Sequence, residues 1–286
     1  MPIIKTVGII SKPHSDEARP LVMNLLAWLK DRGIAVRCDE ATGAYAGTPG
    51  LPRPDVPEGC DLVIVLGGDG TLLSAARAIG RREIPLFPVN MGGLGFLTAI
   101  TIDELYPELQ RAFRGEHRIA KRKLLTVEVV REDKVVASYD ALNDAVLTKA
   151  ALARMIDLDT HVDDQFVCAY KADGLIISTP TGSTAYSLAA GGPVVAPSVG
   201  AFIITPICAH TLTNRPIVLS DTTTIEVAVK SEGEPAYFTV DGQVGMEVHG
   251  EDRVRIRKSA KTVEIVQPSS KNYFQVLRQK LKWGER

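Results

Sequence analysis

The sequence has only four cysteines among its 286 residues, at Cys38, Cys60, Cys168 and Cys208. They do not show the paired spacing of metal-binding motifs. So few scattered thiols in a chain of this length indicate a reduced, cytosolic protein rather than a disulfide scaffold.

Neither sign of charge is in excess, since 33 basic residues face 34 acidic ones and the net charge is -1. This balance argues against the broad basic surface of a nucleic-acid-binding protein. The sequence has no apolar run of the roughly 20 residues needed to span a bilayer. Its N-terminus lacks the basic region and apolar stretch of a signal peptide. We therefore expect a soluble, cytoplasmic protein with neither nucleic acid nor membrane as a partner.

The length allows two domains, and the first of them alternates strand and helix patterns. Such alternation predicts a parallel sheet covered by helices. The Gly- and Pro-rich stretch 41–59 predicts a loop. Strands are predicted over 6–10, 34–38, 61–66 and 85–89, and helices over 19–32, 71–79 and 105–113.

Near residue 121 the pattern changes to short alternating strands separated by polar turns, which predicts an antiparallel β domain. The last segment, 271–283, returns to helical spacing, with Ser269 or Ser270 as its expected cap. We predict an α/β domain over 1–120 joined by the C-terminal helix 270–286, and a β-rich domain over 121–269. Strands of the second domain are predicted over 125–130, 135–139, 155–162, 165–169, 223–229, 236–240, 254–257 and 262–266.

A glycine-rich turn, Gly67-Gly68-Asp69-Gly70-Thr71, follows the apolar run 62–66. Glycines allow positive φ and close approach of a ligand, and a helix starting at Thr71 would offer free N–H groups to a phosphate. The negative charge of an Asp in such a cradle repels phosphate. Its presence makes sense if the carboxylate accepts a hydroxyl proton or binds a metal beside the phosphate, which points to phosphoryl transfer. An ordinary turn with Asp at a helix start explains the motif equally well.

Two further segments are rich in glycine. Residues 90–97 carry glycines at positions 92, 93 and 95, which is not the G-x-G-x-x-G spacing of a dinucleotide fold, although two such loops after neighbouring strands would line one crevice. Residues 173–187 run from a strand into hydroxyls, a glycine and Tyr186. They offer donors to ribose and phosphate and an aromatic face to a base, or form a polar loop before a helix over 184–190. The absence of G-x-x-x-x-G-K-[ST] argues against a Walker-type ATPase.

Weaker candidates lie in the second half. Asn143-Asp144 stands between apolar runs. The pair either forms a turn or binds ribose hydroxyls. Asp241-Gly242-Gln243 is typical of a hairpin turn. Tyr237 and Phe238 are expected to pack in the β domain.

Together these motifs resemble the NAD kinase family, in the family's order and over most of the chain. The long segment 173–187 is the specific part, because Gly-Gly-Asp-Gly is shared with lipid kinases of the diacylglycerol kinase type and with phosphofructokinases. The resemblance implies a Rossmann-like α/β N-terminal domain, an all-β antiparallel C-terminal domain, a last helix that returns to the first domain, and a homodimer or homotetramer. The motifs are 67–71, 143–144, 173–187, 215–219 and 241–243.

The resemblance implies transfer of the γ-phosphoryl group of ATP to the 2′-hydroxyl of the adenosine ribose of NAD, giving NADP and ADP, with Mg²⁺ or another divalent cation. Inorganic polyphosphate serves some members as donor. Asp69 matches the family's proton acceptor; a carboxylate of pKa about 3.9 is a poor base, so its expected work is to orient the hydroxyl and take the proton late.

The resemblance also implies the contact residues. Gly67, Gly68 and Thr71 are expected to cradle phosphate. The family often has Asn-Glu where this chain has Asn143-Asp144, so the carboxylate reaches one methylene less far. Residues expected to contact NAD are Asp69, Gly70, Asn143, Asp144, Arg154, Lys171, Asp173, Thr184, Ala185, Tyr186, Ser187, Leu188, Ala189 and Gln243.

Two other functions remain open. A lipid or sugar kinase would share Gly-Gly-Asp-Gly-Thr, but the segment 179–187 follows the NAD kinase pattern and no amphipathic basic helix suggests membrane docking. A nucleotide-sensing module would keep the cradle without turnover, but a binder has no need of a carboxylate such as Asp69 beside phosphate.

Overall fold

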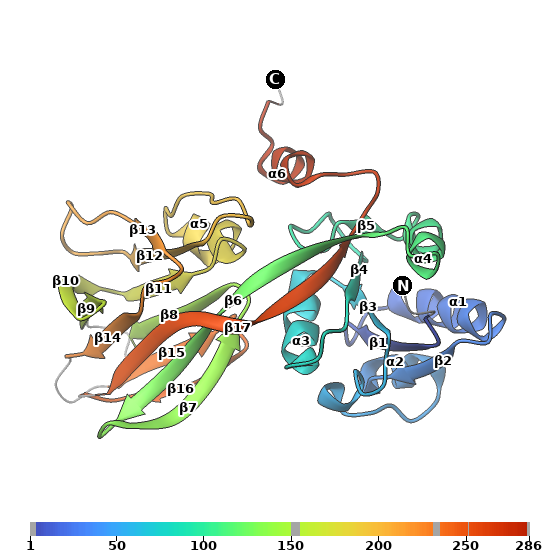
Figure 1. Cartoon of the computed structure of the whole chain (residues 1–286), viewed down its shortest axis with the longest axis horizontal. Helices are drawn as coiled ribbons and strands as arrows, with labels where there is room; N and C mark the ends of the chain where they lie inside the picture. Colours follow the sequence, from blue (N-terminus) through green and yellow to red (C-terminus); the bar gives the residue numbers. More distant parts are fainter. Residues whose placement is uncertain (1–3, 150–154, 231–234, 251, 285–286) are drawn as a thin grey trace. The chain divides into compact units, whose positions relative to one another are not determined.

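The computed structural model describes residues 4–149, 155–230, 235–250 and 252–284. The chain forms two compact units, Met1–Lys121 with Val263–Arg286, and Arg122–Thr262 (Figure 1). The chain passes from one unit to the other within two long strands, β6 (Arg118–Arg131) and β17 (Arg253–Gln267). In the described residues, no helix has the length and apolar character needed to cross a membrane.

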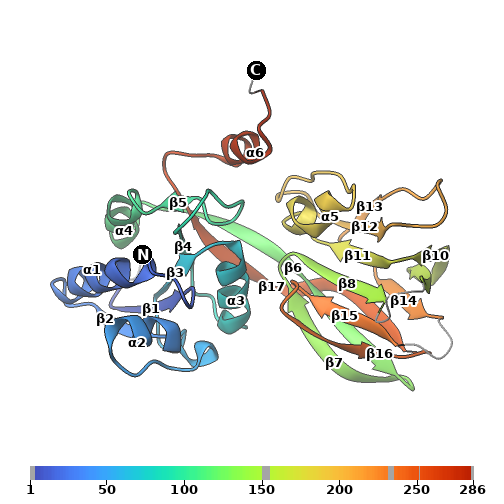
Figure 2. The same ribbon diagram turned by 180° about the vertical axis from the view of Figure 1, so that it is seen from behind.

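The first unit is an α/β layer structure around a parallel sheet of order β2-β1-β3-β4, which confirms the predicted fold class. Core side chains of α1 and α4 cover one face of this sheet, and α3 lies on its other side (Figures 1 and 2). Its strands are β1 (Thr6–Ser11), β2 (Ala35–Cys38), β3 (Leu62–Gly67), β4 (Leu86–Asn90) and β5 (Ile100–Thr101). Its helices are α1 (Ala18–Lys30), α2 (Glu40–Ala46), η1 (Arg53–Asp55), α3 (Asp69–Ile79), α4 (Leu105–Phe113) and α6 (Tyr273–Leu281).

The strand order decides where a ligand can bind. β3 is buried along its whole length because helices cover both faces, which explains its unbroken apolar run. β2 lies on one side of β1 and β3 on the other. The chain therefore leaves β1 toward one edge of the sheet, to β2, and leaves β3 toward the opposite edge, to β4. In open α/β sheets a crevice forms at the carboxyl ends of the strands at this point. Here those ends are Ser11, Gly67 and Asn90.

The loop prediction for 41–59 was wrong. The stretch contains α2 and η1, and a partly buried ion pair fastens it: Arg53 Nη2 lies 2.9 Å from Asp39 Oδ2. Arg53 also donates to the carbonyl of Ser11 and to Ser74 Oγ, at 3.0 Å each. The glycines and prolines suggested a loop because local sequence does not show this long-range partner.

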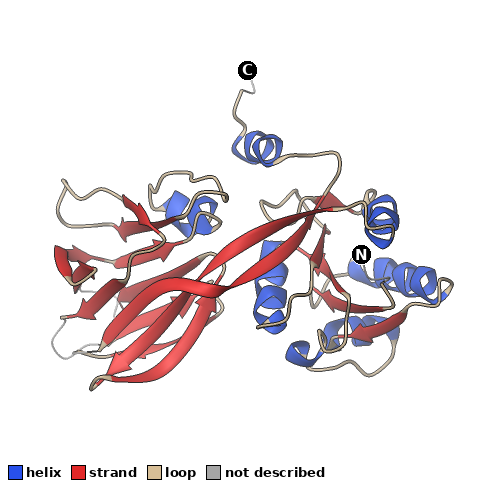
Figure 3. Cartoon of the chain, in the orientation of Figure 1, coloured by secondary structure: helices blue, strands red, loops and turns tan. Residues whose placement is uncertain are grey.

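The second unit consists of two antiparallel layers (Figure 3) that enclose one apolar core, which confirms the predicted antiparallel β domain. One layer has the order β13-β12-β11-β8-β15-β16; the other contains β10, β9, β14 and the parts of β17 and β6 in this unit, with β7. Its remaining strands are β7 (Lys134–Ala141), β8 (Asp144–Lys149), β9 (Ile156–Val162), β10 (Gln165–Ala172), β11 (Gly174–Ser178), β12 (Ala201–Ile207), β13 (Ile217–Ser220), β14 (Ile225–Val229), β15 (Ala236–Val240) and β16 (Val244–Val248).

The hairpin turn at Asp241-Gly242 is confirmed, since both residues have positive φ, 51° and 62°. That is the conformation of the two-residue turns whose twist matches antiparallel strands. The acidic pairs 132–133 and 163–164 adopt the same conformation, with φ between 46° and 65°. Asp tolerates it because its short side chain can bond to nearby backbone.

Several expected details differ. The two strands predicted over 254–266 are one continuous strand, β17. Tyr237 is 41% exposed on β15, whereas Phe238 is buried, because successive strand residues point to opposite faces. The helix predicted over 184–190 is broken into η2 (Gly182–Thr184) and α5 (Tyr186–Ala189).

The cap of the last helix is Asn272 rather than Ser269 or Ser270. Its side chain accepts from the Gln275 backbone N–H at 3.0 Å, and the Gln275 side chain accepts from the Asn272 N–H at 2.8 Å. This reciprocal pair is a capping box. The serines hydrogen-bond to glutamates of the first unit instead, as described below.

Candidate functional site

The carboxylate of Asp69 is anchored by a neighbouring glycine-rich loop. Helix α3 begins at Asp69 rather than at Thr71, with Gly68 as its cap. Asp69 Oδ1 accepts from the backbone N–H of Leu97 at 3.2 Å and of Thr98 at 3.0 Å, and from Thr98 Oγ1 at 2.9 Å. Asp69 Oδ2 accepts from the Phe96 N–H at 2.9 Å. Oδ1 thus receives three hydrogen bonds and Oδ2 only one, and because a carboxylate oxygen can accept at least two, Oδ2 keeps capacity for a ligand hydroxyl.

The glycines around Asp69 serve two different purposes. A Cβ on Gly95 would lie 2.2 Å from Asp69 Oδ1, and one on Gly67 would lie 2.4 Å from Thr71 Oγ1. These two glycines allow close packing. A Cβ on Gly68 or Gly93 would meet nothing within 4 Å. The expectation of positive φ was wrong for this turn, because Gly67, Gly68 and Gly70 are not among the positive-φ glycines.

A cleft of about 390 Å³ opens at the carboxyl ends of β1, β3 and β4. Gly67, Gly68 and Asp69 form one wall, and the loop 90–95 forms another. Lys12, which follows β1, and Lys280 of α6 add positive charge, while Glu17 and Asp69 add negative charge. A cleft with exposed glycine backbone at the start of a helix suits a phosphate chain.

The second unit holds a separate polar cluster around Asn143 and Asp144. Asp144 begins β8 and pairs with Ser178 at the end of β11. The carboxylate of Asp241 accepts from the backbone N–H groups of Leu142, Asn143 and Asp144 at 3.1, 2.7 and 3.2 Å. Asp241 therefore acts as the anchor of this corner, a role that its hairpin-turn pattern did not reveal.

Asn143 and Asp144 are both buried polar residues with capacity for a ligand. Among the described residues, Asn143 Oδ1 is buried without a hydrogen-bond partner. Burial, together with the nearby charge of Asp241 as the smaller cause, raises the pKa of Asp144 to about 7. A buried acceptor without a partner and a carboxyl group held near neutrality are costly in a folded protein, which marks this corner as a candidate site.

The segment 179–189 folds over this corner. The hydroxyl of Thr179 donates to the carbonyl of Leu142 at 2.6 Å. A Cβ on Gly182 would lie 2.1 Å from the Asn143 carbonyl oxygen, so only glycine fits there. Tyr186 is 45% exposed, and its ring is free to meet a ligand.

Not every predicted contact residue has a free polar group. Ser187 is buried and its hydroxyl pairs with Thr205 Oγ1 at 2.9 Å, so Ser187 supports the segment from inside. The hydroxyl of Thr184 donates to the Thr181 carbonyl at 3.2 Å. Ala185, Leu188 and Ala189 lie beside Tyr186 on the same short turns. Gln243 is exposed immediately after the Asp241-Gly242 turn, at the same end of the sheet as Asp144.

Asp173 lies away from this corner. It precedes β11, whereas Thr179 follows it, and strand geometry separates the two ends of β11 by roughly 14 Å. Lys149 Nζ lies 2.6 Å from Asp173 Oδ1. Lys171, exposed in β10, accepts at its carbonyl from the His210 N–H, also at the Asp173 end. Arg154 lies outside the described residues.

Sequence reasoning missed Thr98 and Lys280. Thr98 binds both Asp69 and the side chain of Asn90, whose Nδ2 donates to Thr98 Oγ1 at 2.6 Å. No local pattern marks an isolated threonine as the partner of an Asp 29 residues away. Lys280 resembles any solvated lysine in the last turn of a helix until the fold brings α6 to the cleft.

Known proteins are similar to this chain over its full length. Residues 7–117 match the ATP-NAD kinase N-terminal domain and residues 142–268 the ATP-NAD kinase C-terminal domain. An NAD kinase of Solibacter usitatus is 66% identical, with 100% of both chains covered. An NAD kinase of Geobacter sulfurreducens is 49% identical over 99% of this chain and 100% of that protein.

Solved structures of NAD and NADH kinases are also similar to this chain. The structure of an NAD kinase from Archaeoglobus fulgidus in complex with ATP aligns with a TM-score of 0.78 and 26% identity, covering 97% of this chain and 98% of that one. A yeast NADH kinase complexed with NADH shares the fold, with a TM-score of 0.92 at 24% identity over 100% of this chain and 90% of that one. With full-length relatives of this identity, the chain belongs to the NAD kinase family.

Proposed function

We propose that this protein is an ATP-dependent NAD kinase, which transfers the γ-phosphoryl group of ATP to the 2′-hydroxyl of the adenosine ribose of NAD and releases NADP and ADP. The observation that carries the proposal is the Asp69 carboxylate, held by three backbone N–H groups at a glycine-lined cleft. An anchored carboxylate beside a phosphate-binding surface is needed for transfer to a hydroxyl, not for passive binding.

Asp69 orients the acceptor hydroxyl. The remaining acceptor position of Oδ2 receives the hydroxyl hydrogen bond, directs the oxygen toward the phosphorus, and takes the proton as the new O–P bond forms. Because a carboxylate is a weak base, positioning and charge stabilisation supply most of the rate. The γ-phosphate leaves ADP as its bond to the bridging oxygen breaks.

Asn143 and Asp144 hold the ribose. The unpartnered Oδ1 of Asn143 accepts from a hydroxyl or amino group of the ligand, and ionised Asp144 accepts from ribose hydroxyls. Tyr186 offers its exposed ring to a base. Gly70, Thr184, Ala185, Leu188, Ala189 and Gln243 complete the dinucleotide contacts of this proposal, with Lys171, Asp173 and Arg154 as further contacts.

A divalent cation, Mg²⁺ or another, fits the site only as a companion of the nucleotide. Among the described residues no group of three or more His, Cys, Asp or Glu side chains could hold a metal ion. Mg²⁺ in kinases is bound through one or two carboxylates together with substrate phosphates. Glu17 and Asp69 are the acidic side chains at the cleft, and the cation would neutralise charge on the donor phosphates there.

Three further features belong to the proposal. The protein acts in the cytoplasm, as its free thiols suggest. It forms a homodimer or homotetramer, by analogy with the family. Its donor is ATP, with inorganic polyphosphate as a possible second donor, because a cleft that recognises a phosphate chain need not read the nucleoside.

The proposed reaction is tested by incubating the purified protein with NAD, ATP and Mg²⁺ and measuring NADP with an NADP-specific dehydrogenase. NADH and polyphosphate are run in parallel as alternative acceptor and donor. NADP formation that requires ATP is the expected result. Folded protein that binds NAD but makes no NADP would indicate a sensor, and protein that binds no NAD would revive the lipid and sugar kinases.

Replacing Tyr186 with alanine should weaken NAD binding by about 1–3 kcal/mol, the size of one base–aromatic stacking contact. Calorimetric titration of NAD measures the change. Tyr237→Ala is the matched control, because Tyr237 is similarly exposed, at 41%, on strand β15 of the same unit. Equal dissociation constants for Tyr186→Ala and the natural protein would remove Tyr186 from the site.

A further inference from the structure

The C-terminal helix brings one lysine to the Asp69 cleft. Lys280 lies in the last turn of α6 and lines the cleft, with its Nζ 5.5 Å from the ring centroid of Phe96. In the part of the chain that the structure describes, neither Lys280 nor Lys12 forms an ion pair or a side-chain hydrogen bond. Both ammonium groups therefore remain able to bind an anion.

The charges at the cleft show why a second lysine matters. Glu17 and Asp69 repel a phosphate chain, and Lys12 offsets only one of these two negative charges. With Lys280, the cleft has two positive side chains that balance its two negative ones. The backbone at Gly68 and Gly93, beside which a Cβ would meet nothing within 4 Å, is then open to phosphate oxygens without net repulsion from the walls.

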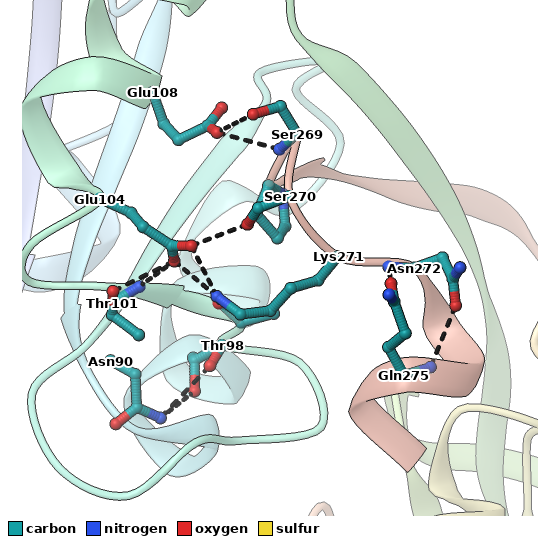
Figure 4. Close-up of polar contacts among 12 residues, drawn as sticks. Asn90, Thr98, Thr101, Glu104, Glu108, Ser269, Ser270, Lys271, Asn272 and Gln275 are labelled. Atoms are coloured by element: carbon teal, nitrogen blue, oxygen red, sulfur yellow. Dashed lines mark hydrogen bonds and ion pairs between the residues drawn. The ribbon is translucent and has the colours of Figure 1, made fainter. Parts of the chain in front are cut away.

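The segment before α6 is fastened to α4 and its preceding turn (Figure 4). Lys271 Nζ lies 2.7 Å from both carboxylate oxygens of Glu104 and 3.3 Å from the Ala99 carbonyl. Ser270 Oγ donates to Glu104 Oε1 at 2.7 Å. The Ser269 N–H donates to Glu108 Oε1 at 2.9 Å, and its hydroxyl donates to the same oxygen.

Glu104 is itself rigidly placed. Its Oε2 accepts from the backbone N–H of Thr101 at 3.0 Å and from the Thr101 hydroxyl at 3.1 Å. Burial acts to raise the pKa of Glu104, but hydrogen bonds from Lys271, Thr101 and Ser270 and the charge of Lys271 outweigh it and lower the pKa to about 2. The carboxylate thus stays charged at every physiological pH and holds Lys271. At its other end α6 is placed against the same unit by Lys280, whose Nζ lies over the Phe96 ring.

We propose that Lys280 binds the phosphate chain of the phosphoryl donor, and that the Glu104–Lys271 ion pair positions α6 so that Lys280 reaches it. The inference rests on the proposed function for the name of the donor. The donor rather than NAD is assigned because the cleft lies wholly within the first unit, whereas the ribose-binding candidates Asn143 and Asp144 belong to the second.

The first test compares Lys280→Ala with Lys282→Ala. Lys282 is an exposed lysine two residues later that does not line the cleft, so both variants lose the same charge from the same terminus. Lys280→Ala should raise the KM for ATP about 10- to 100-fold, as expected for one lost charged hydrogen bond, with an unchanged KM for NAD. Lys280→Arg should restore most of the affinity, and Lys282→Ala should behave like the natural protein. An unchanged KM for ATP, or an equal rise in both KM values, would overturn the assignment.

A second measurement separates failure of this inference from failure of the proposed function. Calorimetric titration with inorganic tripolyphosphate needs no turnover. Weaker binding to Lys280→Ala than to Lys282→Ala supports the anion site even in a protein that makes no NADP. Equal binding to the two variants rejects it even in an active kinase.

The positioning role of Glu104 is tested by a double-mutant cycle. Glu104→Gln removes the charge that holds Lys271 and touches no cleft residue. We expect it to raise the KM for ATP but to add nothing to the effect of Lys280→Ala, because both changes remove the same contact. Additive effects of the two changes would show that Glu104 does not act through Lys280.

Discussion

Replacing Asp69 with asparagine should lower the kcat of NADP formation by about 10²- to 10⁴-fold, the range of a lost proton-accepting group, while NAD binding largely survives. The substitution is nearly isosteric. The amide oxygen can keep the three hydrogen bonds that Oδ1 receives from Leu97 and Thr98. What disappears is the acceptor at Oδ2, which the proposed reaction needs for the hydroxyl.

The control must separate chemistry from loop structure, because Asp69 also anchors residues 96–98. Thr98→Val removes the Thr98 hydroxyl that donates to Asp69 and accepts from Asn90, but leaves the carboxylate in place. We expect this variant to lose less than about tenfold in kcat, or ~1.4 kcal/mol of barrier. If Asp69→Asn turned over as fast as the natural protein, Asp69 would have no part in the transfer; equal losses in both variants would assign Asp69 to loop anchoring alone.

Binding of NAD should strengthen by up to about 50-fold between pH 5 and pH 7 and then level off, because a group with a pKa of about 7 is ionised to about 1% at pH 5 and to about 50% at pH 7. The group is Asp144, whose pKa is raised to about 7 by burial and by the charge of Asp241. Protonated Asp144 has lost one acceptor position for ribose hydroxyls, and ionised Asp144 regains it. Calorimetric Kd values across this range measure the effect.

Asp144→Asn is the matched variant, because it keeps the size of the side chain and removes the titration. Its Kd for NAD should stay nearly constant between pH 5 and pH 8. A slope that persists in Asp144→Asn would assign the pH dependence to another group.

The same residue makes a prediction about stability. The folded-state pKa of Asp144 lies above its unfolded value, so its contribution to stability is complete below about pH 4 and is lost as pH rises through 7. The free energy of unfolding of Asp144→Asn, relative to that of the natural protein, should therefore increase by ~1 kcal/mol per pH unit over that window. Urea unfolding at pH 4, 5.5 and 8 measures this growth, and a constant difference would contradict the raised pKa.

Much of the fold was readable from the sequence because it depends on local pattern. The apolar run 62–66 predicts a buried strand, since a strand covered on both faces cannot alternate. Helix 105–113 was predicted to the residue, because its apolar positions recur at helical spacing. Asp241-Gly242 predicted its own turn, because a two-residue hairpin turn requires positive φ at both positions.

The sequence by itself also marked Asp69 as a place to seek chemistry, because its motif stands with the others in the order of the NAD kinase family; the glycine turn alone fits an ordinary helix start equally well. Only the tertiary structure decided what each glycine does there. Gly95 makes room for Asp69, and Gly68 leaves backbone open to the cleft, yet both are simply glycines in the sequence. The role of each glycine depends on residues that are close in space but distant in sequence. The same holds for the hydrogen-bonded pairs Asp69 with Thr98, Asp241 with Asn143, and Lys271 with Glu104. Local pattern reports the backbone that a segment prefers, whereas contacts across the chain, formed when apolar burial closes the core, decide which polar groups meet.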